Sequence, residues 1–166
     1  MQAINSQLEE LIGKSEGRYM TANELQPLRH YMETVSERSK TYLLLQEKSD
    51  LLVRHALKKL MSVQSDTVKK HAKRCYYDMS MLVRYLALAM LRDDTHFFNE
   101  VIVLWQANIL TAYRQQKACL DAYGYLQETF KDHLPASANR LIQPYMDMML
   151  QLLDLQPKLM ATVERA

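Results

Sequence analysis

The stretch HAKRCYYDMSMLVR at residues 71–84 combines a thiol, a carboxylate and several basic side chains. At about 100° per residue on a helix, His71, Cys75 and Asp78 fall on one face, with Leu82 one turn further on. A thiol there can add to a vinyl or ethylidene group as a thioether, and an ionised carboxylate accepts hydrogen bonds from pyrrole N–H groups. Neighbouring cations could contact propionates, and they are Lys69, Lys70, Lys73 and Arg74. This segment therefore indicates a helix face suited to an anionic pigment.

Simpler interpretations of the same residues stay open. Cys75 belongs to a residue type that is often a small buried hydrophobe, and Asp78 could be a solvated helix carboxylate. With His71 they could also ligate a metal, although no HxxxH or CxxC pair accompanies them. The nearby positive charges predict a lowered pKa for Cys75 and a larger thiolate fraction. Cys119 has no comparable setting, which predicts a core position.

The composition predicts an all-α protein that positions this segment on a long helix. Only three glycines and four prolines interrupt 166 residues that are rich in good helix formers. We expect one domain over residues 1–166, with an N-terminal helical hairpin at 1–32 and a helical body at 33–166. The helical pattern over 22–62 is nearly unbroken and predicts one or two bends near 33 and 47. Later helices are expected at about 67–91, 94–112, 114–132 and from 137 onward.

Capping residues mark two of the expected helix starts. Thr21 and Glu24 have the spacing of a capping box, in which each side chain bonds the other residue's backbone N–H. Asp94 or Thr95 follows the long helix and can cap the next one. These signals predict the ends of the elements that flank the 71–84 segment.

Charge and cysteine content exclude several classes of function. A net charge of +2 with dispersed basic residues does not indicate nucleic-acid binding. Two cysteines form no disulfide framework and no secretion signal is visible, so a cytoplasmic protein is expected. No apolar run reaches the ~20 residues that span a bilayer, so no membrane insertion is expected. No paired carboxylates, nucleophile with a positioned base or phosphate loop is visible, so we expect no enzyme.

Five segments resemble one known family. CYYDMSMLVRYLALAML at 75–91 is similar to the pattern C-x-R-D-x-x-Y-x-L-R-Y-x-x-Y-A-L of a chromophore-attachment helix. GRYMTANELQPLRHYM at 17–32 resembles a G-[RK]-[YF]-[LF] entry, and KSDLLVRHAL at 48–57 resembles a segment with NA-x-x-I-V. NEVIVLWQ at 99–106 and SANRLIQPYMDMMLQLL at 137–153 follow its later helices. The family is the phycobiliproteins, and the resemblance implies an all-α, globin-like phycobiliprotein fold with an N-terminal helical hairpin extension.

The resemblance implies roles for residues in the 71–84 segment. Cys75 falls at the bilin-bearing cysteine, Asp78 at the aspartate that accepts from the pyrrole N–H groups, and Arg84 at an arginine that ties the helix to its surroundings. Lys70, His71 and Arg74 fall near the propionate contacts. Tyr77 replaces a propionate-pairing arginine, and Trp105 replaces a glycine, where it would fill the cleft or stack on a ring as part of the pocket wall. Lys14 replaces an aspartate used in subunit pairing.

These departures from the pattern favour a divergent family member, such as a globin associated with bilin biosynthesis, storage or delivery. The implied cofactor is a phycocyanobilin-like linear tetrapyrrole, bound covalently or not. The implied partners are a second copy or a globin-like subunit, bilin-biosynthesis enzymes or a bilin lyase. One alternative is a thylakoid-associated antenna subunit with covalent bilin. A second is a pigment-free or haem-binding globin-fold protein, whose candidate axial ligands are His30, His55, His71, His96 and His133.

Overall fold

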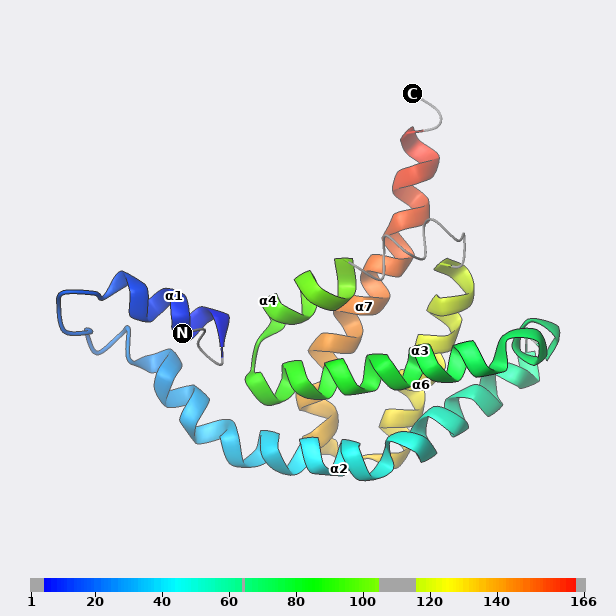
Figure 1. Cartoon of the computed structure of the whole chain (residues 1–166), viewed down its shortest axis with the longest axis horizontal. Helices are drawn as coiled ribbons and strands as arrows, with labels where there is room; N and C mark the ends of the chain where they lie inside the picture. Colours follow the sequence, from blue (N-terminus) through cyan, green and yellow to red (C-terminus); the bar gives the residue numbers. More distant parts are fainter. Residues whose placement is uncertain (1–4, 64, 105–115, 164–166) are drawn as a thin grey trace.

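The computed structural model describes the backbone of residues 5–63, 65–104 and 116–163, and the side chains of residues 5–63, 71–104 and 117–155. The described chain is mainly helical and contains no strand, which confirms the all-α prediction. Figure 1 shows a short helix at one end of the molecule, a long curved helix beneath the rest, and further helices packed above it. The elements are α1 (Ser6–Lys14), α2 (Gln26–Val63), α3 (Ser65–Arg92), α4 (Thr95–Phe98), η1 (Asn99–Val103), α6 (Gln116–His133) and α7 (Ala136–Val163).

Helix α2 runs for 38 residues without a break. Figure 1 shows it as a continuous curve, so the predicted bends occur as gradual curvature and not as new helix starts. Its buried positions Leu45, Leu52 and Ala56 follow helical spacing and face the core. Its outer side stays exposed at Met32 and Leu43. One helix therefore leads from the N-terminal arm (residues 5–25) into the body, and the division at residue 32 stays a prediction.

The core lies where α3, α6 and α7 meet the concave side of α2. Phe98 and Tyr145 pack edge to face with ring centroids 5.4 Å apart, and the Tyr145 hydroxyl donates to the Ala89 carbonyl at 3.1 Å. Leu86 and Met146 are fully buried beside them. Burial of each such apolar side chain stabilises the fold by about 1.5–3 kcal/mol, so this packing fixes the orientation of α3.

Asp94 joins α1 to the corner between α3 and α4. Its Oδ1 accepts from the Phe97 N–H at 2.9 Å and caps α4, as predicted. Its Oδ2 accepts from the backbone N–H and the hydroxyl of Ser6 at 2.9 and 2.8 Å. Asp93, with φ of 54°, provides the left-handed residue that reverses the chain there. One buried carboxylate thus connects two helix starts that are far apart in sequence.

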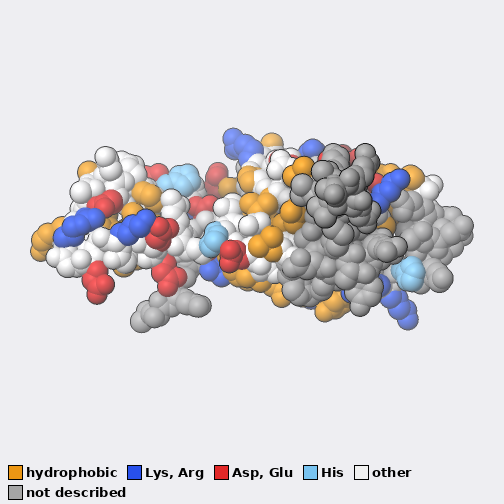
Figure 2. Space-filling view, turned by 90° about the horizontal axis from the view of Figure 1, so that it is seen from above, with side chains coloured by type: hydrophobic (Ala, Val, Ile, Leu, Met, Phe, Trp, Pro, Cys, Tyr) orange, Lys and Arg blue, Asp and Glu red, His pale blue; other side chains and the backbone are white. Residues whose placement is uncertain are grey.

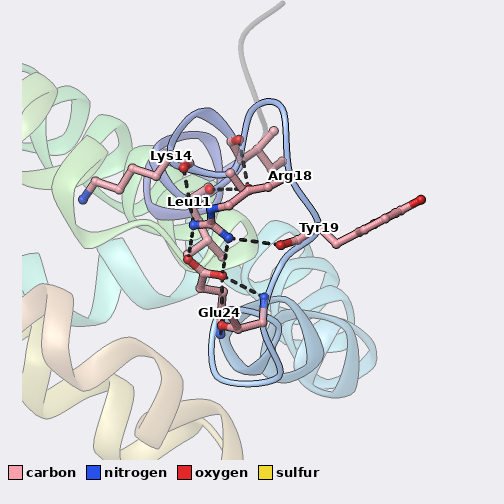
Figure 3. Close-up of polar contacts among 8 residues, drawn as sticks. Leu11, Lys14, Arg18, Tyr19 and Glu24 are labelled. Carbon is pink, nitrogen blue, oxygen red and sulfur yellow. Dashed lines mark hydrogen bonds and ion pairs between the residues drawn. The ribbon is translucent and has the colours of Figure 1, made fainter.

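A cluster of polar contacts lies within the N-terminal arm, in the turn that leads from α1 into α2 (Figure 3). Arg18 donates to both carboxylate oxygens of Glu24 at 2.9 and 2.6 Å. Glu24 accepts from the Thr21 N–H at 2.8 Å while the Thr21 hydroxyl accepts from the Glu24 N–H at 3.3 Å, which confirms the predicted capping box. Tyr19 extends away from this cluster and is 99% exposed.

The surface seen in Figure 2 differs between the end that carries the N-terminal arm and the middle of the molecule. Acidic and basic side chains alternate over the end that carries the N-terminal arm, and hydrophobic side chains gather nearer the middle. Within the described residues, no helix is long and apolar enough to cross a bilayer.

Candidate functional site

A pocket of about 320 Å³ lies between α3 and η1. This volume falls at the lower end of the ~300–1,000 Å³ typical of small-molecule sites. Five residues of α3 and two of η1 line the pocket, and they are Tyr77, Asp78, Met81, Leu82, Tyr85, Val101 and Ile102. Their spacing on α3 places them on one helix face, next to the face predicted from the sequence. Among the described residues, the pocket is therefore a mainly apolar hollow with one carboxyl group.

The η1 wall owes its shape to a π-helical segment. Over Asn99–Val103 the helix is wider than an α-helix, and it follows α4 directly. Val101 is exposed at the rim while the next residue, Ile102, is buried. Such segments occur frequently at functional sites, and this one supplies two neighbouring side chains to the same pocket.

Asp78 supplies the charge of the pocket. Its side chain is 33% exposed, and the Arg74 Nε donates to its Oδ1 and Oδ2 at 3.0 and 2.9 Å. The two residues are one turn apart on α3, so the arginine orients the carboxylate from the same helix. A carboxylate has about four lone-pair sites, so Asp78 can accept further hydrogen bonds from a ligand.

Cys75 is half-buried and is not among the residues that line the pocket. Burial raises the pKa of its thiol, and the negative charge of Asp78 raises it further, which outweighs the opposite effect of Arg74. The expectation that neighbouring cations lower the Cys75 pKa is therefore wrong. The thiol is a weaker nucleophile at neutral pH than a free cysteine.

Cys119 on α6 lies within electrostatic reach of the same residues. It is half-buried and packs against the core, in agreement with the predicted core position. Burial, followed by the charges of Asp78 and Cys75, raises the pKa of Cys119 to about 12. The proximity of this second thiol depends on the contact between α3 and α6, which local sequence patterns do not show.

The other predicted site residues do not all lie at the pocket. Tyr77 lines the pocket and is 59% exposed, whereas His71 is exposed at a non-helical position with φ of −125°, one turn before Cys75. The Lys70 side chain and Trp105 lie outside the described residues. Arg84 is exposed, with its Nη1 3.8 Å from the Met81 sulfur. The roles assigned to these residues stay predictions.

Four lining residues, Met81, Tyr85, Val101 and Ile102, were not among the site residues predicted from the sequence. Met81 lies three residues after Asp78 and one turn after Tyr77, so its place on this face could have been read from the helical period. Ile102 carried no such signal because its position depends on the π-helical segment.

The comparison with family models decides which family the chain belongs to. The model described as "Phycobilisome protein" matches residues 13–153, a range that contains every residue lining the pocket. The chain belongs to the phycobilisome protein family. No curated protein matches it. Membership in the phycobilisome protein family supports a phycobiliprotein-like, bilin-binding protein with the globin-like fold.

The family also bears on the alternatives left open by the sequence. Phycobiliproteins are generally pigment proteins without enzymatic activity, and they form oligomers with partner subunits. Among the described side chains, no group of three or more His, Cys, Asp or Glu residues could hold a metal ion. No histidine is among the described residues that line the pocket.

Proposed function

We propose that this protein binds a linear tetrapyrrole in the pocket between α3 and η1 and acts in bilin biosynthesis, storage or delivery. The observation that carries the proposal is the single carboxylate, Asp78, in an otherwise apolar and aromatic hollow. Inner pyrrole N–H groups need an acceptor, and the conjugated rings need apolar walls, so this donor and acceptor chemistry fits a bilin.

Each neighbouring residue has a defined part in this proposal. Asp78 accepts hydrogen bonds from the pyrrole N–H groups, and Tyr77 contributes to the wall with Trp105 as a further candidate. Arg74, beside Asp78 on α3, meets a propionate, with Lys70 and His71 as further candidates. Arg74 already orients Asp78, so one guanidinium would contact both the propionate and the carboxylate that binds the pyrrole N–H groups.

The state of Cys75 supports reversible binding. A thioether would form when the sulfur bonds to one carbon of an ethylidene group and the thiol proton passes to the other, without any oxidant. That addition proceeds through the thiolate, and the raised pKa of Cys75 reduces the thiolate fraction. Spontaneous attachment is therefore slow, as suits a protein that hands its pigment on.

The proposal is tested by mixing the purified protein with phycocyanobilin and recording the visible spectrum. We expect the long-wavelength band to shift and narrow, and we expect Asp78→Asn to weaken bilin affinity at least tenfold because an amide replaces the anionic acceptor. Glu37→Gln, which neutralises an exposed carboxylate on α2, is the matched control and should bind like the parent. A spectrum identical to that of free pigment for the parent protein contradicts the proposal.

An antenna subunit with covalent bilin is the second candidate, and membership in the phycobilisome family favours it. The exposed apolar residues Ile12, Tyr19 and Met32, near the start of the chain, would suit an unlike partner subunit. Co-expression with bilin-making enzymes and a lyase distinguishes the two candidates. Zinc-enhanced fluorescence that persists on a denaturing gel, together with ring assembly, supports the antenna role, whereas pigment lost on denaturation supports delivery.

The third candidate function, haem binding or no pigment binding, is tested with haemin. Titration with haemin should give no Soret shift in the parent protein, because no histidine is among the described residues lining the pocket. A Soret shift that His96→Gln or His71→Gln removes would favour haem instead.

A further inference from the structure

Two histidines meet at the corner where α6 ends and the chain turns into α7, beside the middle of α2 (Figure 1). His55 of α2 and His133, the last residue of α6, place Nδ1 and Nε2 2.9 Å apart. Their ring centroids are 4.6 Å apart at an interplanar angle of 59°. Both side chains are exposed, so an ion from solvent can reach them.

We propose that His55 and His133 form a binding site for a borderline divalent transition-metal ion such as Ni²⁺, Zn²⁺ or Cu²⁺. Imidazole nitrogens bind such ions at about 2.0–2.1 Å, so two of them at a tetrahedral ion are about 3.3 Å apart. The observed separation of 2.9 Å needs to open by only a few tenths of an ångström. The nitrogen that now donates to the other frees its lone pair when its proton moves to the second nitrogen of the same ring, so both facing nitrogens can bind the ion.

The charges around the pair are balanced. Lys59, one turn after His55, has its Nζ 2.8 Å from Asp132 Oδ2 and 3.5 Å from Glu128 Oε2. Lys48 places its Nζ 3.5 Å from the carbonyl oxygen of His133. Two ammonium groups and two carboxylates therefore lie near the pair, so their charges balance at the entrance.

The ligand count sets the expected affinity and selectivity. No third His, Cys, Asp or Glu joins the pair among the described side chains, so water completes the coordination. Two ligands do not fix the complete coordination geometry of the ion. Affinity should therefore follow the intrinsic preference of the ions for nitrogen ligands and increase from Zn²⁺ and Ni²⁺ to Cu²⁺. A bound ion would join α2 to the end of α6 and raise the thermal midpoint, since the ligands are together only in the folded state.

The test is calorimetric titration of the full, tag-free chain with NiCl₂ and then with ZnCl₂ and CuCl₂. We expect one ion per chain, and we expect His55→Gln and His133→Gln each to weaken Ni²⁺ binding at least tenfold. His30→Gln and His96→Gln change single exposed histidines and should leave the affinity unchanged. Circular dichroism verifies that each variant is folded.

Two further results would overturn the proposal. One is the absence of Ni²⁺ binding below about 1 mM in the folded parent chain. The other is binding that persists in the His55→Gln/His133→Gln double variant but disappears in Cys75→Ser or Cys119→Ser, because the thiols would then be the ligands. A thermal midpoint that rises with Ni²⁺ in the parent and not in His133→Gln supports the site independently of calorimetry.

Discussion

At the scale of single residues, Asp78 influences both thiols near the pocket. It is held by Arg74, it raises the pKa of Cys75, and it contributes to the raised pKa of Cys119. A carboxylate that suppresses ionisation of the adjacent thiols protects them from oxidation and from unselective alkylation. Burial, together with the same charge that suits pyrrole N–H groups, therefore disfavours the thiolate form of both cysteines.

Alkylation rates measure this effect. With a pKa of about 12 against an ordinary 9.0, Cys119 should react with iodoacetamide about a thousandfold more slowly than a free cysteine, and Cys75 should lie between the two. Asp78→Asn should accelerate Cys75 at pH 7.5 because it removes the charge that disfavours the thiolate. Peptide mass spectrometry over a time course gives both rates. Equal rates for Cys75 in parent and variant would refute the electrostatic link.

Residue spacing along the sequence predicted some features of the candidate site and not others. The helical period was enough to place Asp78 and Leu82 on one face, and both line the pocket. It did not show that Cys75 lies outside the pocket lining, because that depends on how α3 rotates against η1. The predicted direction of the Cys75 pKa shift was also wrong, because the burial that raises the pKa depends on the packing of the whole molecule.

At the scale of elements, two short polar clusters hold the N-terminal arm and set the angle at which it leaves the body. The cluster at Asp94 fixes the start of α1 on the corner between α3 and α4. The cluster of Arg18, Thr21 and Glu24 fixes the start of α2. Because α1 buries none of its own residues, these clusters and not a hydrophobic core determine the arm's position.

Asp94→Ala should lower the free energy of unfolding by about 1–3 kcal/mol, because it removes a helix cap and leaves Ser6 without its acceptor. Donors from Phe97, Ser6 and Arg92 together outweigh burial and lower the pKa of Asp94, so its contribution is present above about pH 4 and is lost as the pH falls below that value. Urea unfolding at pH 7 and pH 3 measures both effects. Ser6→Ala, which removes one bond only, should cost less than Asp94→Ala.

The Arg18–Glu24 contact makes a separate prediction about acid. Hydrogen bonds from Arg18 and Thr21 lower the pKa of Glu24 to about 2 from an ordinary 4.5. Its contribution is therefore complete above about pH 4.5 and is lost as the pH falls through about 2. Amide exchange at Thr21 should stay protected at pH 3.5 in the parent chain and should be faster in Glu24→Gln. Equal exchange in both would show that the contact does not order the arm.

At the scale of the whole molecule, α2 determines how the arm and the body are related. Its continuous run from Gln26 to Val63 carries exposed apolar side chains near one end and fully buried ones near its middle. The all-α class and most of the helix limits could be predicted from composition and capping residues, which are local properties of the sequence. The unbroken course of α2 did not, because tertiary packing along its concave side decides whether a long helical pattern breaks or curves.

Association through the arm is the prediction at this scale. Tyr19→Ser together with Ile12→Ser should shift the protein toward monomer, because both side chains are more than half exposed and apolar, at 99% and 58%. Analytical ultracentrifugation of parent and variant gives the dissociation constants. Leu51→Ser, at an exposed position of α2 outside the arm, is the control and should associate like the parent. Identical sedimentation of all three would exclude the arm as an interface.

The wide turn at Asn99–Val103 means that the pocket can be altered by changing the length of the chain as well as its side chains. Removing one residue from a π-helical turn restores an ordinary α-helix, in which successive residues are about 100° apart, so side chains within the turn change direction. Val101 and Ile102 would then take other positions relative to the pocket without any substitution at either residue. A one-residue deletion within Asn99–Val103 is thus enough to reshape this wall.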